Sequence, residues 1–297
     1  MKWITFVVIL AIVAFGALAI RYSRGRDVKS AGENRTTTSR DGTIIAFTKR
    51  GSGPPLIIED GAFCYRENGP ATELATQLAQ HFGVFTYDRR GRGESGDTAP
   101  YTVEREIDDL RAVANEAGEA PYVVGISSGG ALVLQAAASG VNAKEIALYE
   151  PPYLADDNSP RMFEDAKSRL QSLVSAGDRA GAVSFFMTDV YGAPRAFVFA
   201  MPFLMPGAWK RNKLVVHTVA YDLTILDDRS VLNERSSSIS VPTLVIGGEK
   251  SPKGLRDAVT AVANAVPNGK IRFLSGQDHN ISSRALAPVL FEYFGTR

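Results

Sequence analysis

The stretch Gly125-Ile126-Ser127-Ser128-Gly129-Gly130 decides the fold that this sequence predicts. It matches the pattern G-x-S-x-G, with the apolar run YVVGI (122–126) before the serine and the helical run GGALVLQAAAS (129–139) after it. A serine between a buried strand and a helix is typical of a tight turn that exposes a nucleophile, and the flanking glycines let the chain make that turn. The start of a helix also favours negative charge. We therefore interpret Ser127 as a candidate nucleophile rather than an incidental serine in a turn.

Short apolar runs alternate with amphipathic stretches on both sides of this motif. Continuous Val/Ile/Leu/Phe runs are expected of strands that are covered on both faces, and their alternation with helices predicts a mostly parallel sheet between two helical layers. The predicted fold class is therefore α/β. The expected strands are Thr43–Lys49, Pro55–Glu59, Val84–Asp88, Tyr122–Ile126, Glu145–Tyr149, Thr243–Gly247 and Lys270–Leu274. The expected helices are Ala71–Phe82, Val103–Ala117, Gly129–Ser139, Gly254–Ala265 and Arg284–Phe294.

The alternation stops between about Tyr153 and Ser240, where the chain is apolar and aromatic without a convincing strand. We interpret this stretch as a helical cap inserted into the sheet domain, and we expect most of its aromatic side chains to form the core of the cap. The predicted organisation is an N-terminal segment, a polar tether, a first core part, the cap and a second core part, at residues 1–20, 21–36, 37–152, 153–240 and 241–297.

The N-terminal residues 3–20 (WITFVVILAIVAFGALAI) carry no charge. As a helix they would span about 27 Å, close to the ~30 Å hydrocarbon core of a bilayer. Basic residues follow this run, which favours a cytoplasmic position for the rest of the chain. We interpret the run as an uncleaved single-pass membrane anchor. The alternative is a cleaved secretory signal peptide, because Ala17-Leu18-Ala19 has the small-x-small pattern of a cleavage site.

Composition excludes several other classes of protein. The 297 residues carry a formal net charge of +1, with no concentrated basic stripe, so no nucleic-acid partner is expected. The single cysteine, Cys64, excludes an intramolecular disulfide and a thiolate-rich metal site. The stretch Gly91–Gly96 matches G-x-G-x-x-G, but Asp97-Thr98-Ala99-Pro100 follows instead of a helix. A dinucleotide site needs that helix, and no zinc-binding pattern occurs, so we expect neither cofactor nor metal.

A serine hydroxyl needs a base to become a nucleophile, and the chain has three histidines. His81 ends an expected helix and His217 lies in the expected cap. His279 follows the last expected strand, and the order of serine, acid and a histidine near the C-terminus is that of α/β-hydrolases. We therefore choose His279 as the candidate base.

Across residues 37–297 the chain resembles the α/β-hydrolase superfamily. Residues 87–95 (YDRRGRGES) resemble the D-x-R-G-x-G-x-S loop that follows the fourth strand of the family, and Asp60-Gly61-Ala62-Phe63 stands where the family has His-Gly-x-x. The resemblance implies that the oxyanion is held by the backbone N–H groups of Ser128 and Ala62. Asp60 departs from the family pattern, because a carboxylate near a developing oxyanion opposes catalysis unless it points away or is paired.

The triad acid has alternatives. In many family members it follows the strand written here as Thr243–Gly247, in a G-x-x-D turn, but Gly248-Glu249-Lys250-Ser251 has a serine at that position. Glu150 follows the strand Glu145–Tyr149, and some haloalkane dehalogenases, a branch of this fold, carry a glutamate there at similar spacing. We favour Glu150 as a relocated acid. Glu249 is the alternative, and a third possibility is that neither residue serves.

Together these residues predict a serine hydrolase that cleaves a small apolar ester, lactone or amide through an acyl-enzyme. The catalytic residues would be Ser127, His279 and Glu150. One alternative is a cofactor-free haloperoxidase or perhydrolase with the same triad. Another is a non-catalytic ligand-binding protein on a hydrolase scaffold, which Asp60 and Ser251 keep open. Dehalogenation is disfavoured, because that reaction needs a carboxylate nucleophile.

Overall fold

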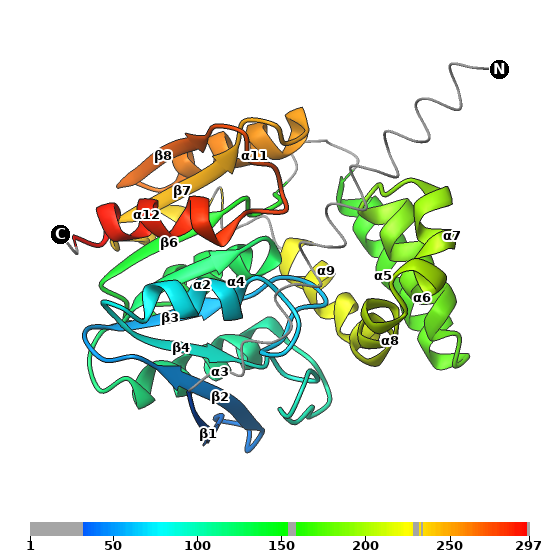
Figure 1. The fold of residues 1–297 in the computed structure, drawn as a ribbon, viewed down its shortest axis with the longest axis horizontal. Helices are drawn as coiled ribbons and strands as arrows, with labels where there is room; N and C mark the ends of the chain where they lie inside the picture. The colour runs from blue at the N-terminus through cyan, green and yellow to red at the C-terminus, as the bar shows by residue number, and fades with distance from the viewer. Residues whose placement is uncertain (1–31, 154–158, 228–231, 233, 296–297) are drawn as a thin grey trace.

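The computed structural model describes residues 32–153, 159–227, 232 and 234–295, and these contain one eight-stranded sheet (Figure 1). The strands run in the order β1-β2-β4-β3-β5-β6-β7-β8; β2 pairs antiparallel with β1 and β4, and all other neighbours are parallel. This architecture confirms the predicted α/β class. The strands are β1 Glu33–Thr38, β2 Ile44–Arg50, β3 Pro55–Glu59, β4 Gly83–Tyr87, β5 Tyr122–Ile126, β6 Glu145–Tyr149, β7 Thr243–Gly248 and β8 Gly269–Leu274.

Helices cover both faces of the sheet. The helices are α2 Ala71–Leu78, α3 Val103–Glu116, α4 Ser128–Ala138, α11 Lys253–Ala265 and α12 Ser283–Tyr293. Side chains of α3, α4 and α11 share one apolar core with Val123 of β5, whereas α2 and α12 share the other with its neighbours Tyr122 and Val124. Successive side chains of a strand point to opposite faces, so a fully apolar strand such as β5 is buried on both. The expected core elements are all present, and the largest difference is that α2 ends at Leu78 instead of Phe82.

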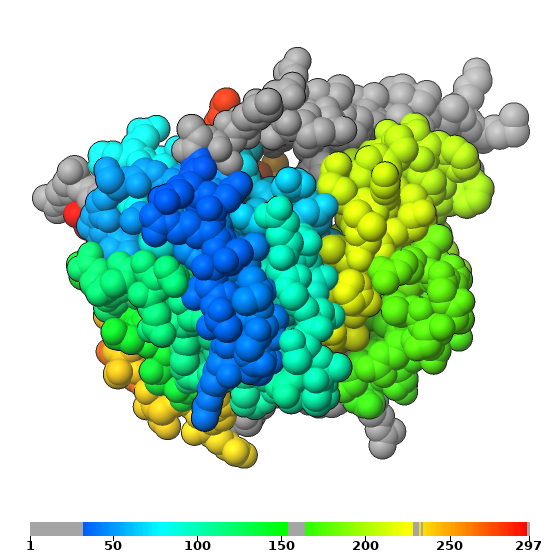
Figure 2. Space-filling view, turned by 90° about the horizontal axis from the view of Figure 1, so that it is seen from below, coloured from blue at the N-terminus to red at the C-terminus, as the bar shows by residue number. Residues whose placement is uncertain are grey.

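Between β6 and β7 the chain leaves the sheet and forms a helical cap (Figure 1). We use this name for residues 159–227, which contain α5 Ser159–Ser175, α6 Arg179–Phe185, η2 Phe186–Val190, α7 Arg195–Leu204, α8 Pro206–Val215, η3 Val216–Thr218 and α9 Val219–Asp227. The predicted helical insertion is confirmed. Helix α9 packs against both α4 and α5, so it joins the cap to the core. Figure 2 shows the green to yellow atoms of the cap against the side of the core.

The strand β1 differs from the sequence prediction, which placed a tether up to residue 36. Its sequence ENRTTT is polar and almost fully exposed, so it lacks the apolar alternation that predicts a strand. Pairing with β2, from Glu33 opposite Lys49 to Thr38 opposite Ile44, creates it. A polar edge strand depends on its neighbour, and its own sequence gives little sign of it.

The prediction of a membrane-anchored protein is corrected. The longest helix among the described residues is α5 with 17 residues, and none of them is both long and apolar enough to cross a membrane. A spanning helix needs about 20 predominantly apolar residues, whereas α5 carries several charged ones. The segment 3–20, on which the prediction of a membrane partner and a membrane location rested, lies outside the described residues.

Candidate active site

Ser127 lies at the tip of a strained turn between β5 and α4. Its backbone has φ 55° and ψ −127°, a left-handed conformation that costs a non-glycine residue on the order of 1–3 kcal/mol. Glycines on both sides allow the close approach that this turn requires. A Cβ on Gly125 would lie 2.6 Å from the Cα of Gly130, and one on Gly129 would lie 2.6 Å from the carbonyl oxygen of Asp60. The glycines of the motif are therefore required because any side chain at these positions would clash with the backbone beside it.

The structure brings three of the predicted site residues into one hydrogen-bonded line. His279 Nε2 lies 3.1 Å from Ser127 Oγ, and His279 Nδ1 lies 2.8 Å from Glu150 Oε2. The three residues follow β5, β6 and β8, whose carboxyl ends meet at one edge of the parallel sheet. Glu150 is fully buried, and the His279 side chain is 17% exposed. This is the arrangement in which a carboxylate orients an imidazole that accepts the serine proton.

Glu150 sits in surroundings that favour its charged form. Burial by itself raises the pKa of a carboxyl, but hydrogen bonds from His279 and from the backbone N–H of Gly248, at 2.7 Å, outweigh it and lower the pKa of Glu150 below its usual value. The buried Ser251 hydroxyl also favours the carboxylate, although its Oγ makes no hydrogen bond of good geometry. Glu150 has φ 45°, so its backbone is also held in the left-handed region.

The alternative acid, Glu249, is not brought to the site. It is exposed and lines a separate surface depression with Arg256 and Phe273. No hydrogen bond or ion pair joins it to His279 within the described part of the chain. The other two histidines lie elsewhere: the ring of His81 packs on Phe291, and His217 lies in the cap.

The two expected oxyanion donors flank Ser127. Ser128 is the first residue of α4, and Ala62 follows β3 in a loop that packs directly on the nucleophile. A Cβ added to Gly61 would lie 3.0 Å from Ser127 Cβ and 3.6 Å from Ser127 Oγ. Among the residues described, the backbone N–H groups of Ser128 and Ala62 donate to no acceptor. Both donors are therefore available to a ligand beside Ser127.

Asp60 is paired within its own loop. Its Oδ1 accepts the N–H of Gly61 at 3.0 Å, and its Oδ2 accepts the N–H of Ala71 at 3.3 Å, where α2 begins. Burial raises the pKa of Asp60 to about 6, although these two N–H groups oppose the rise. The carboxyl group is thus directed to the start of α2, which resolves the conflict that the sequence raised.

A group of buried charges behind the donors was not predicted from the sequence. Asp222 on α9 forms ion pairs with Arg89 at 2.6 Å and Arg92 at 2.7 Å, and it also accepts a hydrogen bond from the Ser128 hydroxyl at 2.8 Å. The arginines lie in the loop that resembles the family pattern, but nothing in the sequence around position 222 marks its carboxylate. Only the docking of the cap on the core brings these groups together.

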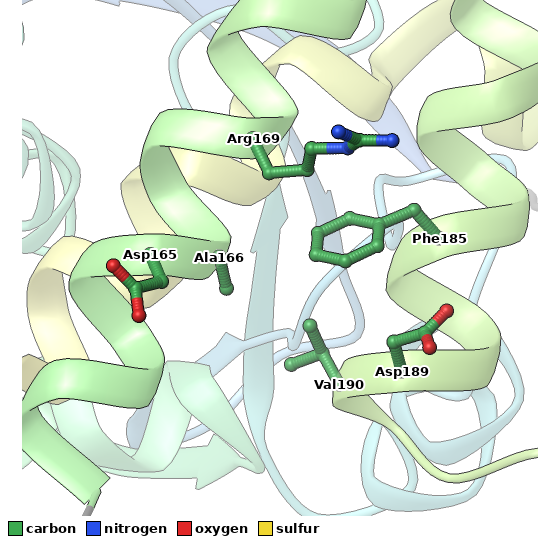
Figure 3. Close-up of a pocket in the computed structure, with 6 residues that line it drawn as sticks. All are labelled: Asp165, Ala166, Arg169, Phe185, Asp189 and Val190. Carbon is green, nitrogen blue, oxygen red and sulfur yellow. The ribbon is translucent and has the colours of Figure 1, made fainter.

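Aromatic side chains of the cap lie beside the site. Phe186 packs edge-on against Phe63 with ring centroids 5.3 Å apart, and Tyr191 lies 6.1 Å from the ring of His279. Both belong to or adjoin the π-helix η2, a rare conformation that often occurs at functional sites. A cavity of about 750 Å³ lies between α5 and the segment of α6 and η2, and is lined by Asp165, Ala166, Arg169, Phe185, Asp189 and Val190 (Figure 3).

Comparison with known proteins identifies the family. The model of the alpha/beta hydrolase family matches residues 51–289. The chain belongs to the alpha/beta hydrolase family. This membership confirms the superfamily and the hydrolase class that the sequence predicted. An alpha/beta hydrolase from Sphaerobacter thermophilus, solved by crystallography, is 43% identical to this chain, with coverage of 88% of this chain and 100% of that one and a TM-score of 0.80.

Two further similarities are more distant. A thermophilic esterase from Thermogutta terrifontis is 19% identical, covers 90% of this hydrolase and 98% of its own chain, and has a TM-score of 0.69. At that identity the likeness extends to the fold alone. The uncharacterized hydrolase YraK of Bacillus subtilis is 34% identical over 108 residues. This match spans 34% of the present hydrolase and 38% of that curated relative.

The contact of Gly129 with the end of β3 gives a test of the turn. In Gly129→Ala the new Cβ would meet the carbonyl oxygens of Glu59 and Asp60, both at 2.6 Å, so we expect a loss of about 1–3 kcal/mol in unfolding free energy. The matched control is Gly130→Ala, where the nearest atom lies at 3.2 Å. Thermal and urea unfolding compare the two variants. Equal stability in both would contradict the packing described for the turn.

The raised pKa of Asp60 predicts a pH-dependent stability. The folded protein keeps this proton up to a pH of about 6, whereas the unfolded chain releases it near its ordinary pKa of 3.8, so this group makes the fold less stable as pH rises through that window. Asp60→Asn removes this dependence. We expect the stability of the variant relative to wild type to increase by about 2 kcal/mol between a pH of about 4.5 and about 7. Urea unfolding at both values measures it, and a constant difference would contradict the assignment.

Proposed function

We propose that this protein is a serine hydrolase that cleaves small, apolar carboxylic esters through an acyl-enzyme. The observation that carries the proposal is the line of hydrogen bonds from Glu150 through His279 to Ser127, with distances of 2.8 and 3.1 Å. A nucleophile within reach of a base, and a base oriented by a third group, are the requirements of this chemistry. Lactones and amides contain the same reacting carbonyl group and belong to the same proposal.

Each step of the proposed reaction uses one of the groups described above. Ser127 Oγ attacks the substrate carbonyl carbon while its proton moves to His279 Nε2, and the carboxylate of Glu150 balances the charge of the resulting imidazolium. The oxyanion is held by the N–H groups of Ser128 and Ala62. His279 then protonates the leaving alcohol, which departs and leaves the acyl group on Ser127. Water, activated by His279, releases the acid and restores the serine.

The relocated acid is consistent with the sheet topology. β6 and β7 are adjacent and parallel, so a side chain after either strand reaches the same edge of the sheet. Glu150, after β6, accepts the N–H of Gly248 at the end of β7, and the buried Ser251 hydroxyl helps to lower the pKa of its carboxyl. We infer that a glutamate at position 150 requires a neutral residue at position 251. A second carboxylate at 251 would repel that of Glu150.

Asp60 and Ser251 were the two residues that favoured a non-catalytic binding protein, and neither argues against catalysis in this site. Asp60 is bonded to Gly61 and Ala71, so its charge is not directed at the oxyanion. The absence of an aspartate at 251 is compensated by Glu150. Phe63 follows the donor Ala62 and packs on Phe186, and Tyr191 lies beside His279, so these aromatic side chains favour an apolar acyl group.

The test follows hydrolysis of a short p-nitrophenyl ester by wild type and four variants. We expect Ser127→Ala and His279→Ala to abolish turnover, and Glu150→Gln to lower kcat by about 10³–10⁴-fold because the imidazole loses its charged partner. Glu249→Gln is the matched control and should retain wild-type turnover. Equal losses in both glutamate variants, or a loss only in Glu249→Gln, would refute the assignment of the acid.

An exchange of the two positions sharpens this test. Glu150→Ser alone removes the acid, and Ser251→Asp alone places two carboxylates in one buried site, so both single variants should be slow. The double variant Glu150→Ser/Ser251→Asp should recover at least about 10-fold in kcat over Glu150→Ser, because the carboxylate again approaches His279. Circular dichroism and thermal unfolding of each variant check that the fold is retained. A double variant no faster than Glu150→Ser would argue against a shared acid site.

A further inference from the structure

The buried carboxylate of Asp222 occupies a central place between the cap and the proposed oxyanion hole. Asp222, Arg89 and Arg92 are each only 1% exposed. Asp222 Oδ1 accepts hydrogen bonds from Ser128 Oγ at 2.8 Å and Arg89 Nη1 at 2.6 Å, and Oδ2 accepts from Arg92 Nη2 at 2.7 Å. A carboxylate with partners on both oxygens is held in one orientation.

The charge on Asp222 is stable in this setting. Burial by itself raises the pKa of the carboxyl, but Arg92 and Arg89, together with the Ser128 hydroxyl, outweigh it and lower the pKa below its usual value. Asp222 is therefore ionised at neutral pH. Loss of its charge would leave the buried guanidinium of Arg92 without the carboxylate that pairs with it, which is costly in a desolvated site. Arg89, in contrast, would keep Glu106 and Glu59.

The first consequence concerns the donor on Ser128. The side chain of Ser128 is tied to Asp222, while its backbone N–H donates to no acceptor of the described chain. Fixing the hydroxyl restricts rotation of this residue at the first position of α4. The hydrogen bond to Asp222 thus holds the Ser128 N–H in place next to Ser127.

The second consequence concerns the donor on Ala62. Arg92 Nη1 donates to the carbonyl oxygen of Gly61 at 2.7 Å, and this carbonyl belongs to the same planar peptide unit as the N–H of Ala62. In a trans peptide the C=O and N–H point in opposite directions, so Arg92 on the oxygen fixes the direction of the N–H on the other side. A cation on the carbonyl also polarises the peptide and strengthens its N–H as a donor. Arg92 donates further to the carbonyl of Cys64 at 3.2 Å.

We propose that Asp222 is a positioning residue of the oxyanion hole, which aligns the N–H of Ser128 through the serine hydroxyl and the N–H of Ala62 through Arg92. This inference rests on the proposed function, because it assigns those two N–H groups to the oxyanion. Asp222 lies on α9 of the cap, and Thr218 just before that helix also accepts from Arg92 Nε at 3.0 Å. The seating of the cap therefore completes the hole in the core, where the cap and the loops after β3 and β4 meet.

The experiment compares Ser128→Ala and Asp222→Asn with a control on the same helix. Tyr221→Phe removes a hydroxyl that bonds Asp97, away from the oxyanion donors, and should leave ester turnover unchanged. We expect Asp222→Asn to lower kcat by about 10–100-fold and Ser128→Ala by about 3–10-fold, with little change in KM, since the interaction matters in the transition state. Ser128→Ala keeps the backbone N–H and removes only the tie to Asp222, so it carries the test if Asp222→Asn fails to fold.

Binding of a transition-state analogue tests whether Asp222 positions the oxyanion donors or only stabilises the fold. Inhibition by a trifluoromethyl ketone, whose adduct places an oxyanion in the hole, should weaken in parallel with kcat/KM in both variants. Folded variants that raise KM with kcat unchanged, or that bind the ketone as wild type does, would overturn the role of Asp222 and leave the Ser127 hydrolase intact. A wild type that turns over no ester would overturn the proposed function itself, so the two failures are distinguishable.

Discussion

The strained turn at Ser127 is the constraint on which the rest of the site depends. Its backbone lies in the left-handed region, and the turn closes because Gly125 and Gly129 let a strand, a helix and the loop after β3 approach within contact distance. That closeness has two effects on chemistry. It projects the hydroxyl from the edge of the sheet toward His279, and it brings the peptide of Ala62 beside the serine. The buried apolar strands beside β5 hold the turn rigidly, and their packing offsets the strain at Ser127.

The buried carboxyl groups around the turn differ in their ionisation. Two carboxylates stay ionised in burial because each has a dedicated set of donors: Glu150 has His279 and the Gly248 N–H, and Asp222 has two arginines and a serine hydroxyl. Asp60 is hydrogen-bonded only by neutral groups, two backbone N–H groups and the Cys64 thiol, and burial raises its pKa. The number and charge of the partners, rather than burial alone, thus decide whether the pKa of a buried carboxyl falls or rises. Glu150 can therefore balance an imidazolium, whereas Asp60 accepts hydrogen bonds at the start of α2.

The sequence predicted the features that depend on residues close together along the chain. Ser127, His279 and the alternating core elements have patterns of short range. Glu150 and Glu249 both directly follow a strand, and Glu150 was favoured because it resembles the glutamate that some haloalkane dehalogenases carry there. The strand β1 was missed because its polar residues become a strand only by pairing with β2. Asp222 was missed because its role arises from the docking of α9 on the core, a long-range contact that no local pattern encodes. The prediction of a membrane anchor rested on the apolar run 3–20 alone, which lies outside the described residues. It is contradicted by the described helices, none of which is both long and apolar enough to cross a membrane.

The central claim is that Ser127 is a nucleophile activated by His279, and reaction with a fluorophosphonate followed by peptide mapping tests it most directly. The account predicts a single adduct on Ser127, with none on the neighbouring Ser128, and almost no labelling in His279→Ala at the same time of reaction. An adduct on another residue, equal labelling of the wild type and His279→Ala, or no adduct on the wild type would contradict it.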